Sequence, residues 1–165
     1  MKKIIIILLI LASGMLWAQS AKKAMIINYT YGGSRLPNDV GGLIAKLTLL
    51  SYDVAQASPS DPPTGALQAQ VSQWISRLTP GDNVFIYIHA FSEKANSKNC
   101  IVTGAPGPSR ELYDLEDLFK RLKKQKVERT TTVILDVMSR NDYHKENIPN
   151  MDRINTEGIL TLYSH

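Results

Sequence analysis

The sequence has few of the residues that bind metals or form covalent crosslinks. Cys100 is the only cysteine, so the chain can form neither an internal disulfide nor a cysteine-based zinc site. The three histidines, His89, His144 and His165, do not show the spacing of metal ligands. We therefore expect this protein to work without a metal ion or another cofactor.

A phosphate-binding loop is also missing. The segment "YGGSRLPND" follows the first apolar segment, and it has neither the G-x-G-x-x-G spacing of dinucleotide-binding loops nor the Walker spacing. This argues against the common nucleotide-binding forms of the α/β folds.

The chain lacks a strong excess of charge of one sign. Without Lys2 and Lys3, 17 basic residues remain against 15 acidic ones. Lysines do gather in "KRLKKQK" (120–126), but no aromatic side chains accompany them, and such a cluster is typical of a solvated helix end. Because single-stranded nucleic acids are bound by basic grooves with aromatic platforms, we expect no nucleic-acid partner.

The sequence has one long hydrophobic run, and it lies at the beginning of the chain. In "MKKIIIILLILASGMLWAQSA", two lysines precede the apolar run Ile4–Ala12, and the small residues Ala18, Ser20 and Ala21 follow it. This order is typical of a secretory signal, and the run is too short to span a bilayer comfortably. We predict that residues 1–20 are a signal peptide and that the protein is exported, to the periplasm or outside the cell. An uncleaved membrane anchor is the alternative.

The remainder of the chain has the composition and patterning of one globular domain. Of its 165 residues, 44% are hydrophobic and 21% are charged, which suits a single core. Apolar segments of strand type alternate with segments of helical spacing. Strands are expected at 23–29, 52–57, 83–91, 130–137 and 158–164, with a short one at 100–104, and helices at 40–50, 67–78 and 112–122.

This alternation predicts a particular fold class. Strands that alternate with helices form right-handed crossovers and a parallel sheet that is covered on both faces. We expect an α/β three-layer sandwich with a mostly parallel sheet of about five strands. Ligands of such sheets bind where loops leave the carboxyl ends of the strands. Two polar loops stand out at this edge, one after "VFIYI" and one after "VILD".

Three segments resemble the caspase and metacaspase peptidase domain. The first, "KKAMIINYTYGGSRLPNDVGGLIAKLTLLSYDV", is similar to its opening, and the matching residues are Asn28, Tyr29, Leu36, Asn38 and Asp39. The second, "GDNVFIYIHAF", resembles the family's Gly-Asp-x-x-x-Phe-Tyr-x-Ser-Gly-His-Gly. The third, "TTVILDVMSRN", resembles its strand that ends in Asp-Ala-Cys-x-Ser-Gly. The likeness covers residues 22–165 and implies the caspase type of three-layer α/β sheet.

The two reacting groups of that family are replaced in this chain. Family catalysis uses a cysteine thiolate, a histidine that transfers protons, and backbone donors for the oxyanion. The resemblance places Phe91 at the histidine position and Met138 at the cysteine position. A thioether has no ionisable proton, and a phenyl ring cannot accept one. We therefore expect an inactive pseudopeptidase that acts by binding.

Two neighbouring residues could substitute for the lost pair. His89 lies two residues before Phe91, so both side chains face the same side of a strand, about 7 Å apart along it. Ser139 directly follows Met138. If His89 and Ser139 acted together, the chain would be a divergent caspase-like hydrolase that cleaves after Arg or Lys. An unrelated α/β binding module, such as a flavodoxin-like domain, is the third interpretation.

The resemblance also implies two residues that recognise substrate. In metacaspase-like members, carboxylates at the positions of Asp39 and Asp136 help to bind an arginine or lysine side chain. Carboxylates suit a guanidinium because charge-assisted, bidentate hydrogen bonds are strong and directional. The partner expected from this is a peptide or protein with basic residues. Structural roles for both residues remain open, a helix cap for Asp39 and bonds to loop amides for Asp136.

The last expected strand, at 158–164, leads to a prediction about partner chains. The family continues beyond the segment that matches "GILTLYS" into a small-subunit portion, which the domain at 22–165 lacks. The edge of the sheet beside the last strand would then have no neighbour, and exposed strand edges tend to pair. We predict that another chain, or a second copy in a homodimer, covers this edge.

Overall fold

The computed structural model describes residues 20–29, 40–57, 66–103, 111–139 and 156–164. The proposed signal peptide and Asp39 lie outside these ranges. The helices are α2 (Val40–Leu49), α3 (Ala66–Ile75) and α4 (Leu115–Lys124), and a 3₁₀ turn spans Glu128–Thr130. The strands are β1 (Lys22–Tyr29), β2 (Asp53–Ala57), β3 (Asn83–Ala95), β4 (Lys98–Val102), β5 (Leu112–Asp114), β6 (Thr131–Ser139) and β7 (Leu160–Ser164).

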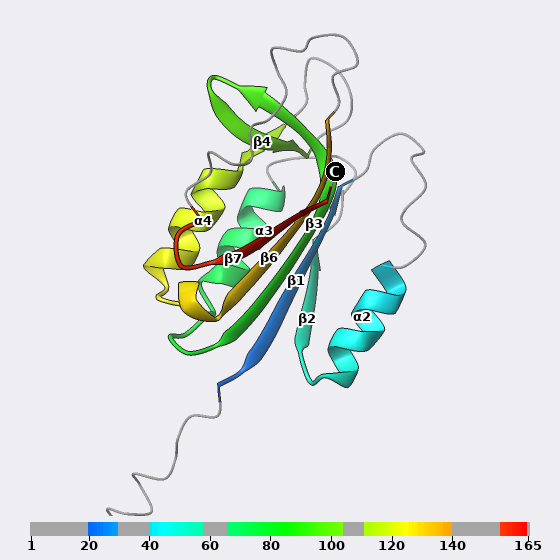
Figure 1. Cartoon of the computed structure of the whole chain (residues 1–165), viewed down its shortest axis with the longest axis vertical. Coiled ribbons are helices and arrows are strands. Elements are labelled where there is room, and N and C mark those ends of the chain that lie inside the picture. Colours follow the sequence, from blue (N-terminus) through cyan, green and yellow to red (C-terminus); the bar gives the residue numbers. More distant parts are fainter. Residues whose placement is uncertain (1–19, 30–39, 58–65, 104–110, 140–155, 165) are drawn as a thin grey trace, which may run out of the picture.

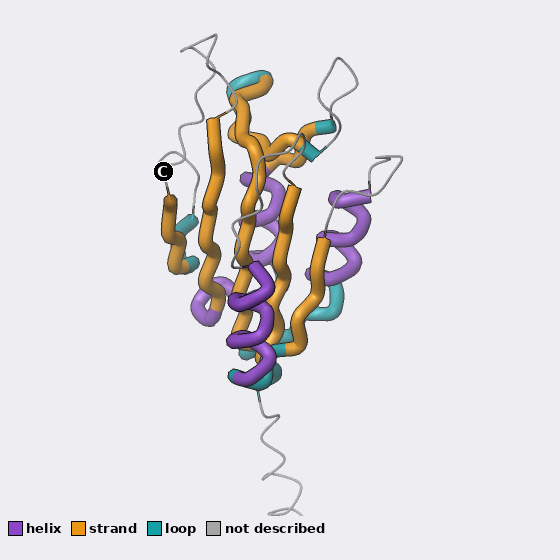
Figure 2. The backbone as a smooth tube through the Cα atoms, turned by 90° about the vertical axis from the view of Figure 1, so that its right-hand side faces the viewer, coloured by secondary structure: helices purple, strands orange, loops and turns teal. Residues whose placement is uncertain are grey.

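Five strands form one parallel sheet in the order β2-β1-β3-β6-β7, and their side-by-side arrangement can be followed in Figure 2. The end of β3 continues beyond this sheet, where β4 pairs with β3 and β5 pairs with β4, both in antiparallel fashion. Helix α2 covers one face, while α3 and α4 cover the other (Figure 1). The predicted three-layer α/β sandwich with a mostly parallel sheet is confirmed.

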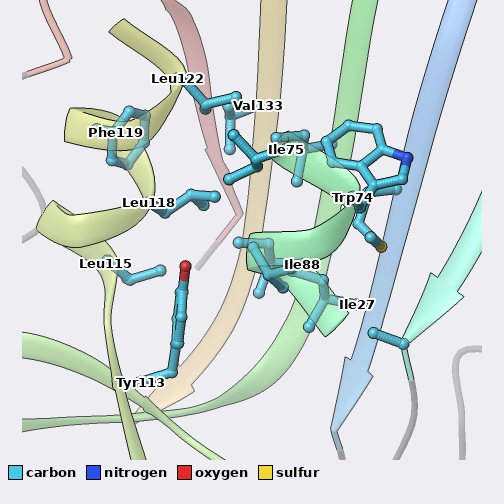
Figure 3. Close-up of a cluster of buried hydrophobic side chains, with 14 of the residues drawn as sticks. Ile27, Trp74, Ile75, Ile88, Tyr113, Leu115, Leu118, Phe119, Leu122 and Val133 are labelled. Carbon is cyan, nitrogen blue, oxygen red and sulfur yellow. The ribbon is translucent and has the colours of Figure 1, made fainter. Parts of the chain in front are cut away.

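The core follows from this layering. Strand β1 is central and buried on both faces, with each residue of its run Ala24–Ile27 at most 2% exposed, as expected for a strand inside a parallel sheet. The larger cluster of buried side chains lies between the sheet and α3 and α4 (Figure 3). A smaller one lies under α2, around Leu47. The sheet therefore has one heavily covered face and one that α2 covers only in part.

The sequence of α4 explains why this segment forms a helix. Four buried apolar residues recur at helical spacing, namely Leu115, Leu118, Phe119 and Leu122, and form the stripe that faces the core. The Asp114 side chain accepts a hydrogen bond from the Glu116 backbone N–H at 2.9 Å, which caps the first turn. Basic side chains occupy the last turn, where they complement the helix dipole. In the described part of the chain, no helix combines the length and apolar character that crossing a membrane requires.

Two local predictions are wrong in detail. The polar segment "SEKANSKN" (92–99) lies between the strands expected at 83–91 and 100–104 and was therefore expected to be a loop. It is the end of β3, a tight turn and the start of β4. Asn96 and Ser97 have φ values of 49° and 65°, which is the geometry of a type I′ hairpin turn. The third helix was expected from Leu112, but Leu112–Asp114 is strand β5, because Asp114 is already the cap of α4.

The Gly81-Asp82 pair has a structural role. Gly81 has a φ of +93° in the turn before β3, a conformation that glycine adopts without strain. The Asp82 carboxylate accepts hydrogen bonds from the backbone N–H and the hydroxyl of Thr79, at 2.8 and 3.0 Å. It also forms an ion pair with Lys23 at 3.2 Å. Burial alone would raise the pKa of Asp82, but the Thr79 hydrogen bonds and Lys23 outweigh it, so the pKa is lowered.

We expect Asp82→Asn to lower the free energy of unfolding by about 1–3 kcal/mol near neutral pH, because Lys23 loses its ion-pair partner and the Thr79 donors lose a charged acceptor. A lowered folded-state pKa stabilises the fold above the pKa of the unfolded chain, and this gain is lost as pH falls through the folded value. The difference between the two proteins should therefore shrink in acid. Urea unfolding at several pH values measures it, with the exposed Asp53→Asn as control; a difference that does not depend on pH would contradict this role.

Candidate functional site

Three neighbouring parallel strands carry polar side chains at the same level, close to their carboxyl ends. Asn28 on β1 is the register partner of His89 on β3, and His89 is the register partner of Asp136 on β6. Side chains of register partners in parallel strands point to the same face of the sheet. We call Asn28, His89 and Asp136 the polar row. It lies on the face of the sheet that α2 covers in part, at the edge where ligands of such sheets bind.

Hydrogen bonds hold the polar row in place. His89 Nδ1 lies 3.0 Å from Asp136 Oδ2, and the Tyr87 hydroxyl donates to the same oxygen at 2.7 Å. The rings of Tyr87 and His89 are stacked, with centroids 6.5 Å apart and planes 5° from parallel. Burial and the adjacent Asp136 carboxylate raise the pKa of Tyr87, so its hydroxyl remains a donor. Because an ionised carboxylate only accepts, His89 carries its proton on Nδ1 in this bond.

The polar row also presents atoms without a protein partner. His89 is 6% exposed, and its Nε2 is buried without a hydrogen bond in the described structure; the same holds for Asn28 Oδ1. When the imidazole is neutral with its proton on Nδ1, its Nε2 has an acceptor lone pair. Most buried polar groups are hydrogen-bonded. Two unpartnered acceptors side by side therefore suit a ligand that donates hydrogen bonds.

The two positions implied by the resemblance are brought together by the fold. Phe91 on β3 and Met138 on β6 are register partners, one side-chain repeat beyond the polar row. Phe91 is half-buried. The side chains of Met138 and Ser139 lie outside the described part. Neither a phenyl ring nor a thioether can act as an acid, a base or a nucleophile toward an amide, so this pair cannot perform the chemistry of the family.

The two suggested substitutes, His89 and Ser139, have different partners in the described structure. The partner that the described structure gives to His89 is Asp136, and the backbone register partner of Ser139 is Ser92. Ser92 follows Phe91 on the strand and is 2% exposed, so it faces away from His89. Burial raises the pKa of the Cys100 thiol to about 11, which makes it a poor nucleophile near neutral pH.

Sequence reasoning missed Tyr87 and Asn28 as members of this site, and treated His89 and Asp136 as belonging to separate functions. A signal was present, because in each of the three strands a polar residue directly follows the apolar run. Aligning "MIINY", "IYIHAF" and "VILDV" at the first polar residue after each apolar run places Asn28, His89 and Asp136 side by side.

The geometry suits hydrogen bonding to a ligand better than metal binding. Across the described ranges, no group of three or more His, Cys, Asp or Glu side chains is arranged to hold a metal ion. The His89–Asp136 pair can orient an imidazole and hold a proton on it. Comparison with models of known protein families finds no match to this chain, and no curated protein sequence matches it either.

Proposed function

We propose that this protein is an exported, caspase-like domain that binds peptides or proteins with basic residues and does not cleave them. The observation that supports this most is the register pairing of Phe91 with Met138 on β3 and β6. The resemblance assigns a histidine and a cysteine to these positions, and the pairing is where a reacting dyad would have to lie. With Phe and Met at these positions, the histidine and the cysteine are both absent from the place where they would react. Peptidase chemistry of the family type is therefore not expected there.

The polar row supplies the chemistry for recognising a basic side chain. Only Oδ2 of Asp136 is used by Tyr87 and His89 among the described residues, and the Asp136 side chain is 28% exposed. Its Oδ1, His89 Nε2 and Asn28 Oδ1 are three acceptors on neighbouring strands. A guanidinium has five donors in a rigid plane and no acceptor. An arginine side chain therefore complements this set better than an acidic or apolar one does.

We expect the protein to prefer a positively charged side chain to a neutral one of similar shape. A fluorescent peptide with a single arginine should bind at least about tenfold more tightly than the same peptide with citrulline, because a hydrogen bond to a charged partner contributes roughly 1.5–3 kcal/mol. Asp136→Asn should remove this preference. Anisotropy titrations measure both affinities, and mass spectrometry shows whether the peptide stays intact.

Asp53→Asn is the matched control, since Asp53 is an exposed carboxylate at the amino end of β2 and should leave the preference unchanged. Equal affinity for the two peptides would rule out recognition of a basic residue at the polar row. A preference that survives Asp136→Asn would place the binding site elsewhere.

A second candidate function is favoured by the 3.0 Å contact between His89 and Asp136. A carboxylate that orients an imidazole is the supporting half of many hydrolytic sites. The chain would then be a divergent caspase-like hydrolase that cleaves after Arg or Lys. Cleavage of the arginine peptide by the unaltered protein, lost in His89→Gln, would favour this candidate over the first.

Export and partner pairing belong to the same proposal. The order of lysines, apolar run and small residues in 1–20 supports a periplasmic or secreted location. Within the described sheet β7 pairs only with β6, and Leu160 and Leu162 on β7 are 59% and 49% exposed. Exposed apolar side chains on an edge strand support the proposal that another chain or a second copy pairs there.

A further inference from the structure

A concave region lies on the opposite face of the sheet from the polar row. It is a hollow of about 390 Å³ between α3 and α4, whose lining includes Ser72, Lys120, Arg121, Lys124 and Gln125. Figure 1 shows the two helices lying beside each other on this face. The volume is in the range of small-molecule sites. Three cationic side chains line it against one carboxylate, that of Asp117, which favours an anionic ligand.

Two of the cationic side chains that line this hollow have at most a long contact with a carboxylate among the described residues. Arg121 is paired with Asp117 at 2.6 Å. Lys120 lies 3.9 Å from Glu116 and is 75% exposed, while Lys124 makes no ion pair within the described ranges. Lys120 and Lys124 are one helical turn apart and therefore neighbours on the surface of α4. Two adjacent ammonium groups suit an anion that carries two charges, such as a phosphate monoester.

An adjoining hollow of about 280 Å³ shares Asp117 and Lys120 with the first and is lined also by Gln68 and Tyr113. Tyr113 is 4% exposed, and its hydroxyl is buried without a hydrogen-bond partner in the described structure. Figure 3 shows this hydroxyl directed toward the side chains of Leu115 and Leu118 on α4. Burial and the nearby Asp117 raise the pKa of Tyr113, so it stays a donor. Phenol, amide and carboxylate groups together suit the hydroxyls of a polyol.

We propose that the two hollows form one site for a small, soluble phosphate monoester of a polyol or sugar. The phosphate lies between Lys120 and Lys124, and the hydroxyl-bearing part lies beside Tyr113, Gln68 and Asp117. Because α3 and α4 are packed on the face away from the polar row, this site is independent of the proposed peptide binding.

Calorimetric titration with glycerol 3-phosphate tests the site. We expect saturable binding, and a loss of at least about tenfold in affinity when Lys120 and Lys124 are both changed to Gln, because two charge-assisted contacts are removed. Lys46→Gln changes an exposed lysine in the last turn of α2, on the other face, and should leave the affinity unchanged. No saturable binding, or an equal loss in Lys46→Gln, would overturn the proposal.

The variant Tyr113→Phe tests whether the ligand is bound by a defined site or only by basic side chains on the surface. We expect it to weaken glycerol 3-phosphate several-fold and to leave the affinity for inorganic phosphate unchanged, because only the ester reaches the adjoining hollow. The free energy of unfolding without ligand should not fall, since the hydroxyl has no protein partner to lose. An equal effect on both ligands, or none on either, would overturn the assignment. Binding to phosphatidic acid vesicles without binding to glycerol 3-phosphate would overturn the proposal that the ligand is soluble.

Discussion

Phe119→Ala should lower the free energy of unfolding by about 3–5 kcal/mol. Phe119 is 2% exposed and projects from α4 into the cluster between the helices and the sheet (Figure 3). Removing a buried ring loses its transfer free energy and leaves a cavity, because the surrounding side chains relax only in part. Since α4 is ten residues long, it depends on this packing rather than on its own propensity.

Unfolding in urea, followed by circular dichroism, measures this loss. Leu49→Ala is the matched control, because Leu49 is also an apolar helical residue but is 84% exposed, so the change should stay within about 0.5 kcal/mol. If Phe119→Ala cost no more than Leu49→Ala, α4 would not be packed on the sheet, and the hollows that depend on its position would lose their basis.

Much of the fold could be predicted from the sequence because its strands and helices have strong local patterns. The run at Ala24–Ile27 is apolar on both faces, which indicates a central parallel strand, and the structure confirms it. Helix α4 was recognisable from apolar residues at helical spacing. The five parallel strands agree with the expected number.

The β3–β4 hairpin was missed because its signal is not hydrophobic. Glu93 and Asn99 are 7% and 5% exposed, so polar side chains occupy buried positions where apolar ones are usual. The turn at Asn96 and Ser97 depends on two residues with positive φ, and Asn-Ser is a weaker signal for such a turn than Asn-Gly. The start of α4 was misplaced for a similar reason, since Leu112 fits the apolar spacing but lies on β5.

The candidate site was only partly predictable because it depends on register. The sequence identified His89 and Asp136 as residues of interest, but their contact follows from the pairing of β3 with β6, which brings together residues 47 positions apart. A shift of one residue in this register would turn one of the two side chains to the other face. Asn28 joins them through a third strand for the same reason.

Phe91 and Met138 occupy paired positions on β3 and β6, where the resemblance places a histidine and a cysteine. In Phe91→His with Met138→Cys, the register puts the two new side chains on adjacent strands, about 4.8 Å apart in the backbone. An imidazole beside a thiol lowers its pKa and raises the thiolate fraction. The double variant should therefore react with a peptidyl chloromethyl ketone that carries arginine, because the thiolate displaces chloride and forms a thioether.

The single variant Met138→Cys provides the matched control. It has the thiol without the imidazole, so we expect it to be labelled at least about tenfold more slowly. Asp136→Asn added to the double variant should slow labelling again if the polar row holds the arginine.

The most direct measurement is therefore mass spectrometry of the unaltered protein and the double variant after exposure to this reagent. The account predicts an unmodified native chain and a double variant alkylated at the introduced thiol. Alkylation of the native chain at His89 or Ser139, or cleavage of the corresponding arginine peptide by it, would contradict the account and favour the hydrolase.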